Sequence, residues 1–214
     1  MKKAIIFYKK QIILFQKFTL KGDFKMANIT YELITDGNIE ICRDLCNALM
    51  AFQKEQATIG KEAFDMMNFD TRMKVSYAGA LRAHVVVAKD GDKAVGYIFS
   101  TIDETPEEAR GYFPPWAPKG EGFIGFYPEW LELPQNTGCL SNLYVLPEYK
   151  GMGIGKKLTE MAVEWLESFD DVDISFVYIS NGNDNAEEFY KKFGFTYCHD
   201  VYGGFIRAAY KKKV

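Results

Sequence analysis

Three glycines at alternate positions, Gly151, Gly153 and Gly155, lie in the stretch whose residue types point most plainly to chemistry. They follow an apolar run, 140–146, that ends at Pro147, which is the pattern of a buried strand. Glycines let the backbone turn its N–H groups toward a ligand, and a helix start adds partial positive charge. The stretch therefore predicts a phosphate-binding loop. Three lysines add full charges: Lys150, Lys156 and Lys157. Apolar residues at helical spacing predict a helix after the loop: Leu158, Met161, Ala162, Trp165 and Leu166.

Two common phosphate-binding motifs do not fit this loop. A Walker A loop requires G-x-x-x-x-G-K-[ST]. Here Lys150 stands five residues before Gly155, and Lys157 takes the place of the magnesium-binding Ser or Thr. The dinucleotide fingerprint G-x-G-x-x-G requires a glycine where the sequence has Lys156. The loop is therefore expected to bind a phosphate compound of another kind.

The segment from Lys150 to Gly155 resembles the pyrophosphate loop, Arg/Gln-x-x-Gly-x-Gly/Ala, of the GNAT superfamily of acyl-CoA-dependent N-acyltransferases. Lys150 departs from the usual Arg or Gln: it keeps a donor but loses the planar fork. A second block, 183–195, resembles the family's Asn-x-x-Ala-x-x-x-Tyr-x-x-x-Gly-Phe segment. Its matching residues are Asn183, Ala186, Tyr190, Gly194 and Phe195. The resemblance covers about residues 28–210.

This resemblance implies an α/β (α+β) fold, the GNAT fold. Its central sheet is mixed and mostly antiparallel, with a parallel V-shaped splay between strands 4 and 5 and helices on both faces. The apolar patterns agree, because the strand at 172–180 should return parallel to the strand at 140–146 through a right-handed helical crossover. Further strands are expected at 29–34, 84–88, 94–101, 195–198 and 204–210, and further helices at about 36–56, 61–80 and 183–192.

The resemblance also implies that acetyl-CoA is the co-substrate, and it indicates which residues bind it. Main-chain groups of the stretch Leu143, Tyr144 and Val145 would hold the pantetheine arm and polarise the thioester carbonyl. Asn183 would bind the same arm. Pyrophosphate would be bound over Lys150, Gly151, Met152, Gly153, Ile154, Gly155 and Lys156.

Tyr190 matches the family's tyrosine near the thiol sulfur, so the resemblance implies that it protonates the leaving thiolate. Its ordinary pKa of about 10 is close enough to the pKa of a thiol, about 8.5, for proton donation. An attacking amine must lose a proton, and the glutamate that some members place on the preceding strand is absent here. Glu132 is the leading substitute base and Glu129 the second. Orientation of the substrates could also supply most of the catalysis.

Residues 102–138 make an unusually long connection for a compact domain. They hold six prolines and many aromatic residues, among them Tyr112, Phe113, Trp116, Phe126, Tyr127 and Trp130. One interpretation is an aromatic wall or lid over the acceptor, where ring faces could hold a cation. The other is a loop packed on itself, or a patch covered by a second subunit.

Length and composition predict one domain, 26–214, carrying this insertion, and an N-terminal extension, 1–25, outside the family domain. The net charge is −3, but the extension holds seven lysines and one acid, so the remainder is acidic. An acidic body suits cationic acceptors and gives no indication of nucleic-acid binding. The extension lacks the features of a secretory signal, and no span reaches transmembrane length. We therefore expect a cytoplasmic protein without stable membrane insertion, although a basic amphipathic extension could lie on a membrane surface or a partner.

Two histidines and four cysteines without C-x-x-C predict no metal site. The expected function is an N-acetyltransferase that moves an acetyl group from acetyl-CoA to a primary amine of a small molecule by direct attack. Two alternatives stay open: an acyl-CoA-binding regulatory module without turnover, and a protein N-terminal or lysine acetyltransferase. The insertion would crowd a peptide groove, which ranks the last alternative lower. The resemblance also allows a homodimer, since dimers are frequent in the family.

Overall fold

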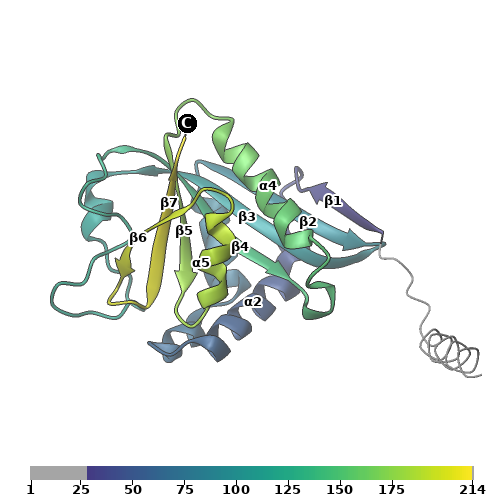
Figure 1. The fold of residues 1–214 in the computed structure, drawn as a ribbon, viewed down its shortest axis with the longest axis horizontal. Helices are drawn as coiled ribbons and strands as arrows, with labels where there is room; N and C mark the ends of the chain where they lie inside the picture. Colours follow the sequence, from purple (N-terminus) through teal and green to yellow (C-terminus); the bar gives the residue numbers. More distant parts are fainter. Residues whose placement is uncertain (1–27, 214) are drawn as a thin grey trace, which may run out of the picture.

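A computed structural model of the chain describes residues 28–213. The extension at 1–25 lies outside these described residues. The rest forms one seven-stranded sheet in the order β1-β2-β3-β4-β5-β7-β6, with helices on both faces (Figure 1). Neighbouring strands are antiparallel except β4 and β5, which are parallel. The predicted fold class is therefore confirmed.

The strands and helices lie where the apolar patterns predict them, except that the segment 61–80, expected as one helix, forms three short helical pieces. The strands are β1 (Ile29–Leu33), β2 (Arg82–Asp90), β3 (Lys93–Thr105), β4 (Gln135–Val145), β5 (Ile174–Ser180), β6 (Thr196–Val201) and β7 (Ile206–Lys212). The helices are α2 (Arg43–Gln56), α3 (Lys74–Gly79), α4 (Ile154–Glu167) and α5 (Asp184–Lys191). Short helical turns are η1 (Ile39–Cys42), η2 (Lys61–Met66), η3 (Phe69–Met73), η4 (Glu107–Gly111) and η5 (Pro147–Tyr149).

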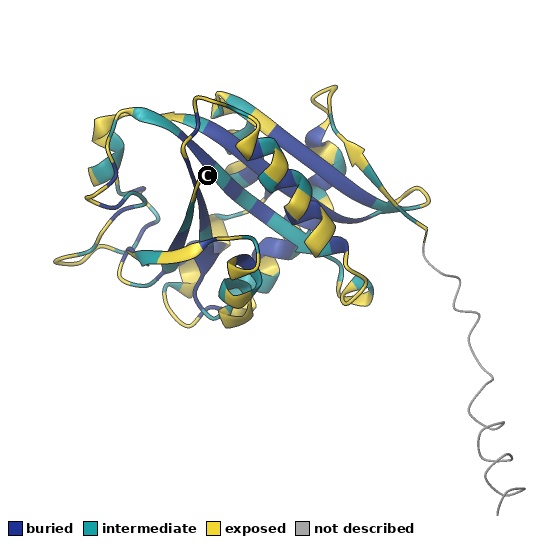
Figure 2. Cartoon of the chain, turned by 45° about the horizontal axis from the view of Figure 1, so that its top comes forward, coloured by how far each residue is buried: buried dark blue, intermediate teal, exposed yellow. Residues whose placement is uncertain are grey.

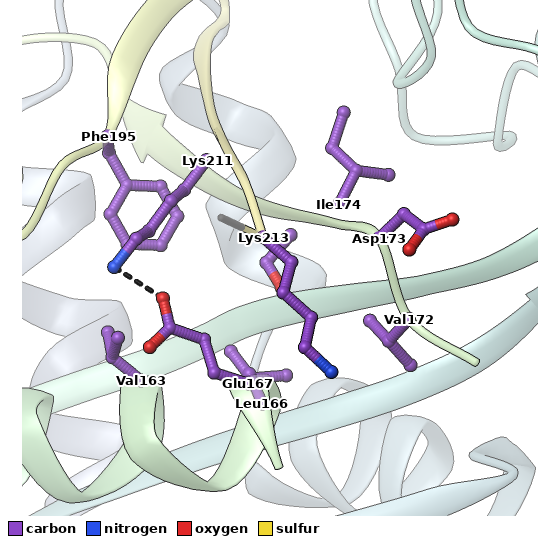
Figure 3. A pocket seen from close by; sticks show the side chains of 10 residues that line it. Val163, Leu166, Glu167, Val172, Asp173, Ile174, Phe195, Lys211 and Lys213 are labelled. Atoms are coloured by element: carbon purple, nitrogen blue, oxygen red, sulfur yellow. Dashed lines mark ion pairs between the residues drawn. The ribbon is translucent and has the colours of Figure 1, made fainter. Parts of the chain in front are cut away.

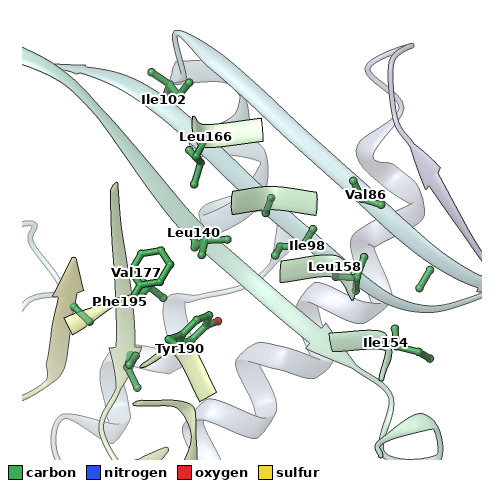
Figure 4. Close-up of a cluster of buried hydrophobic side chains, with 14 of the residues drawn as sticks. Val86, Ile98, Ile102, Leu140, Ile154, Leu158, Leu166, Val177, Tyr190 and Phe195 are labelled. Carbon is green, nitrogen blue, oxygen red and sulfur yellow. The ribbon is translucent and has the colours of Figure 1, made fainter. Parts of the chain in front are cut away.

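One face of the sheet is covered by α4 and α5, and it holds the largest group of buried apolar side chains (Figure 4). Leu158 and Leu166 of α4 are buried in this group together with Ile98 of β3. Figure 2 shows the outer side of α4 exposed and the strands beneath it buried. The helix is therefore held by its apolar stripe.

The opposite face is covered by α2 and the turns that follow it. Side chains alternate along a strand, so Val86 faces α4 while its neighbours Val85 and Val87 join the cluster under α2. Cys42 and Cys46, one helical turn apart, are both buried in that second cluster as free thiols. The sheet thus separates two cores, and the functional groups described below lie where the sheet opens.

The connection between β3 and β4 packs over the face of the sheet that α2 covers. Because Thr105 still pairs with Gln135, the connection itself spans 106–134. The Arg110 guanidinium ties it together by donating to the carbonyls of Pro128, Glu129 and Leu131 at 2.7–2.8 Å. Its rings pack on the rest of the domain, since Trp116 and Phe126 both contact Tyr202 in the β6–β7 turn. The Arg110 hydrogen bonds agree with the interpretation of a loop packed on itself.

Asn181 joins three separate segments at the end of β5. Its side chain is 6% exposed. The Oδ1 atom accepts from the N–H groups of Thr58 and Ile59 at 2.6 and 2.9 Å, and Nδ2 donates to the carbonyls of Ile59 and Phe205 at 3.0 and 2.9 Å. One amide thereby satisfies main-chain groups from the α2–η2 loop and the β6–β7 turn.

Replacing Asn181 with leucine should lower the free energy of unfolding by about 3 kcal/mol, because several buried main-chain groups lose their partners at once. Urea denaturation measures this loss. Asn136→Leu is the matched control, since its Nδ2 bonds Asp171 at an exposed position, and it should cost less than about 1 kcal/mol. Equal losses in the two variants would contradict the role assigned to Asn181.

His84 is a structural imidazole. It is 7% exposed and stacks on Trp165, with ring centroids 4.9 Å apart. Burial lowers the pKa of His84 to about 4. In the unfolded chain His84 binds a proton as the pH falls below its ordinary pKa of about 6.5. In the folded chain it binds that proton only near pH 4.

The free energy of unfolding should therefore fall as the pH drops from 6.5 toward 4, by up to about 1.4 kcal/mol per pH unit from this one group. His84→Phe keeps the ring and removes the titration, so its stability should fall less steeply than that of the wild type. Urea denaturation at pH 7 and pH 5 measures the difference. The same pH slope in both proteins would overturn this account.

Candidate active site

The parallel strands β4 and β5 pair only briefly and then diverge. Their register covers 137–140 on β4 and 174–177 on β5. Both strands continue beyond that point, to Val145 and Ser180. The β4 edge from Ser141 onward therefore faces an open slot, called here the split, instead of a neighbouring strand. This is the predicted V-shaped splay.

Main-chain groups of Leu143 and Val145 face the split. The N–H of Leu146 donates to the carbonyl of Val95 on β3 at 2.9 Å, so Leu146 points its main chain away from β5. Main-chain directions alternate along a strand, which turns Leu143 and Val145 the other way. Tyr144, between them, directs its main chain at β3 and packs its side chain against the cluster under α2. The split is thus lined by main-chain donors and acceptors that have no strand partner among the described residues.

The β4 strand bulges where the split begins. Ser100 pairs with Leu140 and Phe99 with Asn142, so Ser141 is an extra residue on β4. Bulges redirect side chains and end regular pairing, and they are common beside active sites. The bulge here turns Ser141 toward two hollows on the α2 face.

The glycine loop follows β4 after the short turn η5 and leads into α4. Gly151 and Gly153 have φ values of +82° and +80°, which side chains other than glycine rarely adopt. None of the N–H groups from Gly151 to Lys156 makes a main-chain hydrogen bond within residues 28–213; the first that does, at Lys157, donates to Gly153 at 3.0 Å. A Cβ at Gly151 or Gly153 would meet nothing within 4 Å, so the space before these donors is open. A run of free amides at a helix start fits a pyrophosphate.

The loop lysines contribute less directly than the main chain. Lys150 places its Nζ 5.0 Å from the ring centre of Phe52 on α2, at the side of the loop nearer the second face. Lys156 is well exposed, with Glu160 at 3.7 Å. Exposed charges of this kind are screened by solvent. The main-chain amides are therefore the better-defined anion donors.

Tyr190 on α5 is buried among Leu140, Val177 and Phe195, near the start of the split (Figure 4). Its hydroxyl makes no hydrogen bond within the described part of the chain. Burial, and secondarily the nearby Cys139 thiol, raises the pKa of Tyr190 well above its ordinary value. The difference between the pKa of Tyr190 and that of a thiol is therefore larger than the sequence indicated. This favours a hydrogen bond from the hydroxyl to the sulfur over complete proton transfer.

Asn183 is the N-cap residue of α5, but its side chain makes no capping hydrogen bond. Its main chain holds the turn instead, since its N–H donates to Ser180 at 3.3 Å and its carbonyl accepts from Ala186 at 3.1 Å. The neighbouring Asp184 is engaged by Arg207. Within residues 28–213 the Asn183 side-chain amide therefore has no hydrogen-bond partner. It lies beside the end of β5, and the family resemblance predicts that it binds the pantetheine arm.

Two hollows meet at the bulge on the α2 face. The larger, about 300 Å³, runs from Ser141 along β3 and β4 toward Asp103. The smaller, about 50 Å³, lies toward Asn142 and Ser180 under the insertion. They share four lining residues: Arg72, Phe126, Ser141 and Tyr178. An acceptor could therefore reach the split through a partly aromatic, partly charged passage.

Arg72 and Asp103 are the charged residues of this passage, and the sequence argument missed both. Asp103 is the only acid among the residues that line the two hollows. Burial raises its pKa, and the hydroxyl of Thr101 donates to it at 2.8 Å. Asp103 lies on β3 beyond Thr101, where the apolar pattern ends. Its position in an unusually long strand was the only sequence feature that could have indicated a functional role. No sequence feature set Arg72 apart.

Glu132 and Glu129 are not brought to the split. Glu132 is exposed and lines a separate hollow with Trp130 and Lys212, at the beginning of β4. The split starts after Leu140, farther along the same strand. Glu129 is also exposed, and its carbonyl is held by Arg110. Neither carboxylate lines the acceptor passage.

A further hollow lies between the end of α4 and strands β5 and β7 (Figure 3). Lys211 pairs with Glu167 across its mouth at 2.6 Å. Its volume of about 10 Å³ holds one water molecule at most. It is therefore no substrate site. Among residues 28–213 there is also no group of three or more His, Cys, Asp or Glu side chains that could hold a metal ion.

Comparison with known proteins agrees with this geometry. The family described as "Acetyltransferase (GNAT) family" matches residues 51–195. No curated protein matches the chain. No helix of the described residues is long and apolar enough to cross a membrane.

Many solved structures share the fold. PH1933 from Pyrococcus horikoshii OT3 is 21% identical, with a TM-score of 0.52, and the match covers 87% of this chain and 99% of that one. Arabidopsis thaliana Naa50 in complex with the bisubstrate analogue CoA-Ac-MVNAL is 17% identical, with a TM-score of 0.53 and coverage of 86% and 98%. PaiA N-acetyltransferase from Thermoplasma acidophilum in complex with coenzyme A is 15% identical, with a TM-score of 0.55 and coverage of 86% and 98%. Because all three sequence identities are low, the similarity of these structures to the chain shows a shared fold only.

Proposed function

The chain belongs to the acetyltransferase (GNAT) family, and on that premise we propose that it transfers the acetyl group of acetyl-CoA to a primary amine of a small molecule by direct attack. The observation that supports this most strongly is the continuity of the split with the free amides from Gly151 to Lys156. Acetyl-CoA laid along this path has its pyrophosphate at the start of α4 and its thioester at the bulge near Ser141.

The proposed reaction forms one bond and breaks another. The amine nitrogen attacks the thioester carbon, a C–N bond forms, and the C–S bond then breaks. We assign the main-chain N–H of Leu143, the nearer of the two to the bulge, to the developing oxyanion. The N–H of Val145, about 7 Å farther along the strand, then binds the pantetheine arm. The hydroxyl of Tyr190 donates a hydrogen bond to the sulfur as negative charge grows there. The amine loses a proton, and the thiolate gains one on release.

The acceptor amine enters in its neutral form. Asp103, the one acid that lines the passage, pairs with Thr137, while Leu140 at the split pairs with Ser100. Three residues along a strand correspond to about 10 Å, which is too far for direct proton abstraction. The ammonium proton therefore leaves to water before attack, and positioning of the two substrates supplies most of the rate.

The insertion supports a small acceptor over a peptide. Trp116 and Phe126 pack on the β6–β7 turn at Tyr202, and the Tyr202 N–H donates to Ile124 of the insertion at 2.9 Å. These contacts leave two adjoining hollows of about 300 and 50 Å³ on this face. A peptide acceptor would need an open groove at the place that the insertion occupies.

Thiol release from acetyl-CoA, measured with a broad panel of small amines and a panel of short peptides, tests this proposal. We expect turnover with at least one small amine, and slower turnover with every peptide. Calorimetric binding of acetyl-CoA without thiol release from any acceptor would favour a regulatory module. Faster turnover with peptides would favour a protein acetyltransferase.

A further inference from the structure

Among residues 28–213, Arg72 differs from the other arginines in having no acidic partner. The sequence holds five arginines, all within residues 28–213. The other four each pair with at least one carboxylate: Arg43, Arg82, Arg110 and Arg207. For Arg72 the one side-chain partner in the described residues is the hydroxyl of Ser76, at 3.4 Å. Its guanidinium stays charged at any physiological pH.

Arg72 also lies where an acceptor must pass. It is half-buried and lines both hollows, beside Ser141 at the start of the split. A cation that is partly removed from water and left unpaired is costly, so protein surfaces seldom keep one without a function. Its planar fork matches a carboxylate in two parallel hydrogen bonds. The unpaired guanidinium thus marks a binding site for an anionic group close to the reacting centre.

The far end of the larger hollow has the opposite character. Asp103 lies there about 10 Å from the split, with Thr101 and Thr137 beside it. A carboxylate at that end suits a cationic or hydrogen-bond-donating group. The walls between the two ends are aromatic, with Phe126, Tyr127 and Tyr178.

We propose that the acceptor is an α-amino acid or a similar small amphoteric amine, whose carboxylate binds Arg72 while its amine faces the thioester. Its side chain extends along the larger hollow toward Asp103, which favours a distal amine or other donor. This inference rests on the proposed function and specifies its substrate class.

The test compares free amino acids with their amides. Thiol release from acetyl-CoA is measured with the twenty L-amino acids, with the amide of each, and with 1,5-diaminopentane. In the wild type, kcat/KM for the best free amino acid should exceed that for its amide by more than about tenfold, because the amide lacks the charge that Arg72 binds. In Arg72→Gln this ratio should fall toward one. Arg72→Lys, which keeps the charge and loses the fork, should give an intermediate ratio.

Arg82→Gln is the matched control, because Arg82 pairs with Asp171 at an exposed position on another part of the sheet. It should leave the ratio unchanged, and unaltered acetyl-CoA binding in Arg72→Gln would show that this variant is folded. Asp103→Asn should raise KM for L-lysine several-fold and leave KM for L-norleucine, which lacks the distal amine, nearly unchanged.

The outcomes separate this inference from the proposed function. Equal rates for amino acids and amides in the wild type, or a ratio that persists in Arg72→Gln, would overturn the role of Arg72. Turnover of 1,5-diaminopentane with no turnover of amino acids would overturn the substrate class and leave the acetyltransferase standing. Absence of thiol release with every amine would instead count against the proposed function itself.

Discussion

Replacing Gly153 with aspartate should weaken CoA binding by more than about 100-fold. The new carboxylate would stand at the N-cap of α4, before the free amides from Gly151 to Lys156 that we assign to the pyrophosphate. Two like charges about 4 Å apart at a protein surface repel by about 4 kcal/mol, which corresponds to roughly a thousandfold in affinity. Calorimetric titration with CoA measures the loss.

Asparagine at the same position is the matched control. Asp and Asn have nearly the same shape and tolerate positive φ comparably, so both variants carry similar strain. Gly153→Asn should therefore lose much less affinity than Gly153→Asp. Pantetheine, which lacks the pyrophosphate, should bind both variants alike. Equal CoA affinities for the Asp and Asn variants would show that the pyrophosphate lies elsewhere.

Tyr190→Phe should lower kcat by about 100-fold and leave the affinity for acetyl-CoA unchanged. The variant removes a donor that acts only when charge develops on the sulfur, and a single donor of this kind is worth about 10² to 10³ in rate. Because the hydroxyl has no partner in residues 28–213, its loss should not destabilise the fold. Burial raises the pKa of Tyr190, so it stays protonated throughout the physiological range and should cause no loss of rate as the pH rises to 9.

Steady-state kinetics and urea denaturation of the variant separate these effects. Tyr197→Phe is a suitable control, since Tyr197 is exposed on β6 and its hydroxyl bonds only Asp200, at 3.3 Å, among the described residues. It should keep the wild-type kcat. If Tyr190→Phe also kept kcat within threefold, the hydrogen bond to sulfur would have to come from another group.

The parallel crossover and the glycine loop could be predicted from local patterns, whereas the divergence of the two parallel strands was implied by the resemblance to the family. Positions 151 and 153 have positive φ values, which favour glycine whatever residues surround the loop. The apolar runs of β4 and β5, joined by one amphipathic helix, leave a right-handed parallel crossover as the expected arrangement. These features depend on few contacts between distant residues.

The acceptor side was harder to predict because it is built from segments far apart in the chain. Arg72 lines the same hollow as Ser141 only because η3 follows α2 over this face of the sheet, and no pattern near residue 72 indicates that placement. Asp103 lies on β3 because the strand pairs with β4 four residues beyond its apolar stretch, as far as Thr105. Asn181 looks like an ordinary turn residue, and its contacts with two other segments appear only in the fold.

Glu132 illustrates the limit of reasoning from proximity in the sequence. It lies shortly before β4, the strand that carries the split, which made it a reasonable candidate for the base. The insertion, however, returns to β4 at Gln135, and the split opens only beyond Leu140. A carboxylate before the beginning of the strand therefore lies on the wrong side of the paired segment. Whether a residue near β4 can reach the split depends on where along the strand it lies.

The central claim is that acetyl-CoA lies along the split with its pyrophosphate on the loop before α4. Amide chemical shifts in a ¹⁵N-labelled protein, followed while acetyl-CoA is added, test it most directly. We predict that the largest shifts occur at Gly151 to Lys156 and at Leu143 and Val145. Unchanged shifts at these amides, with the main changes elsewhere on the sheet, would contradict the account.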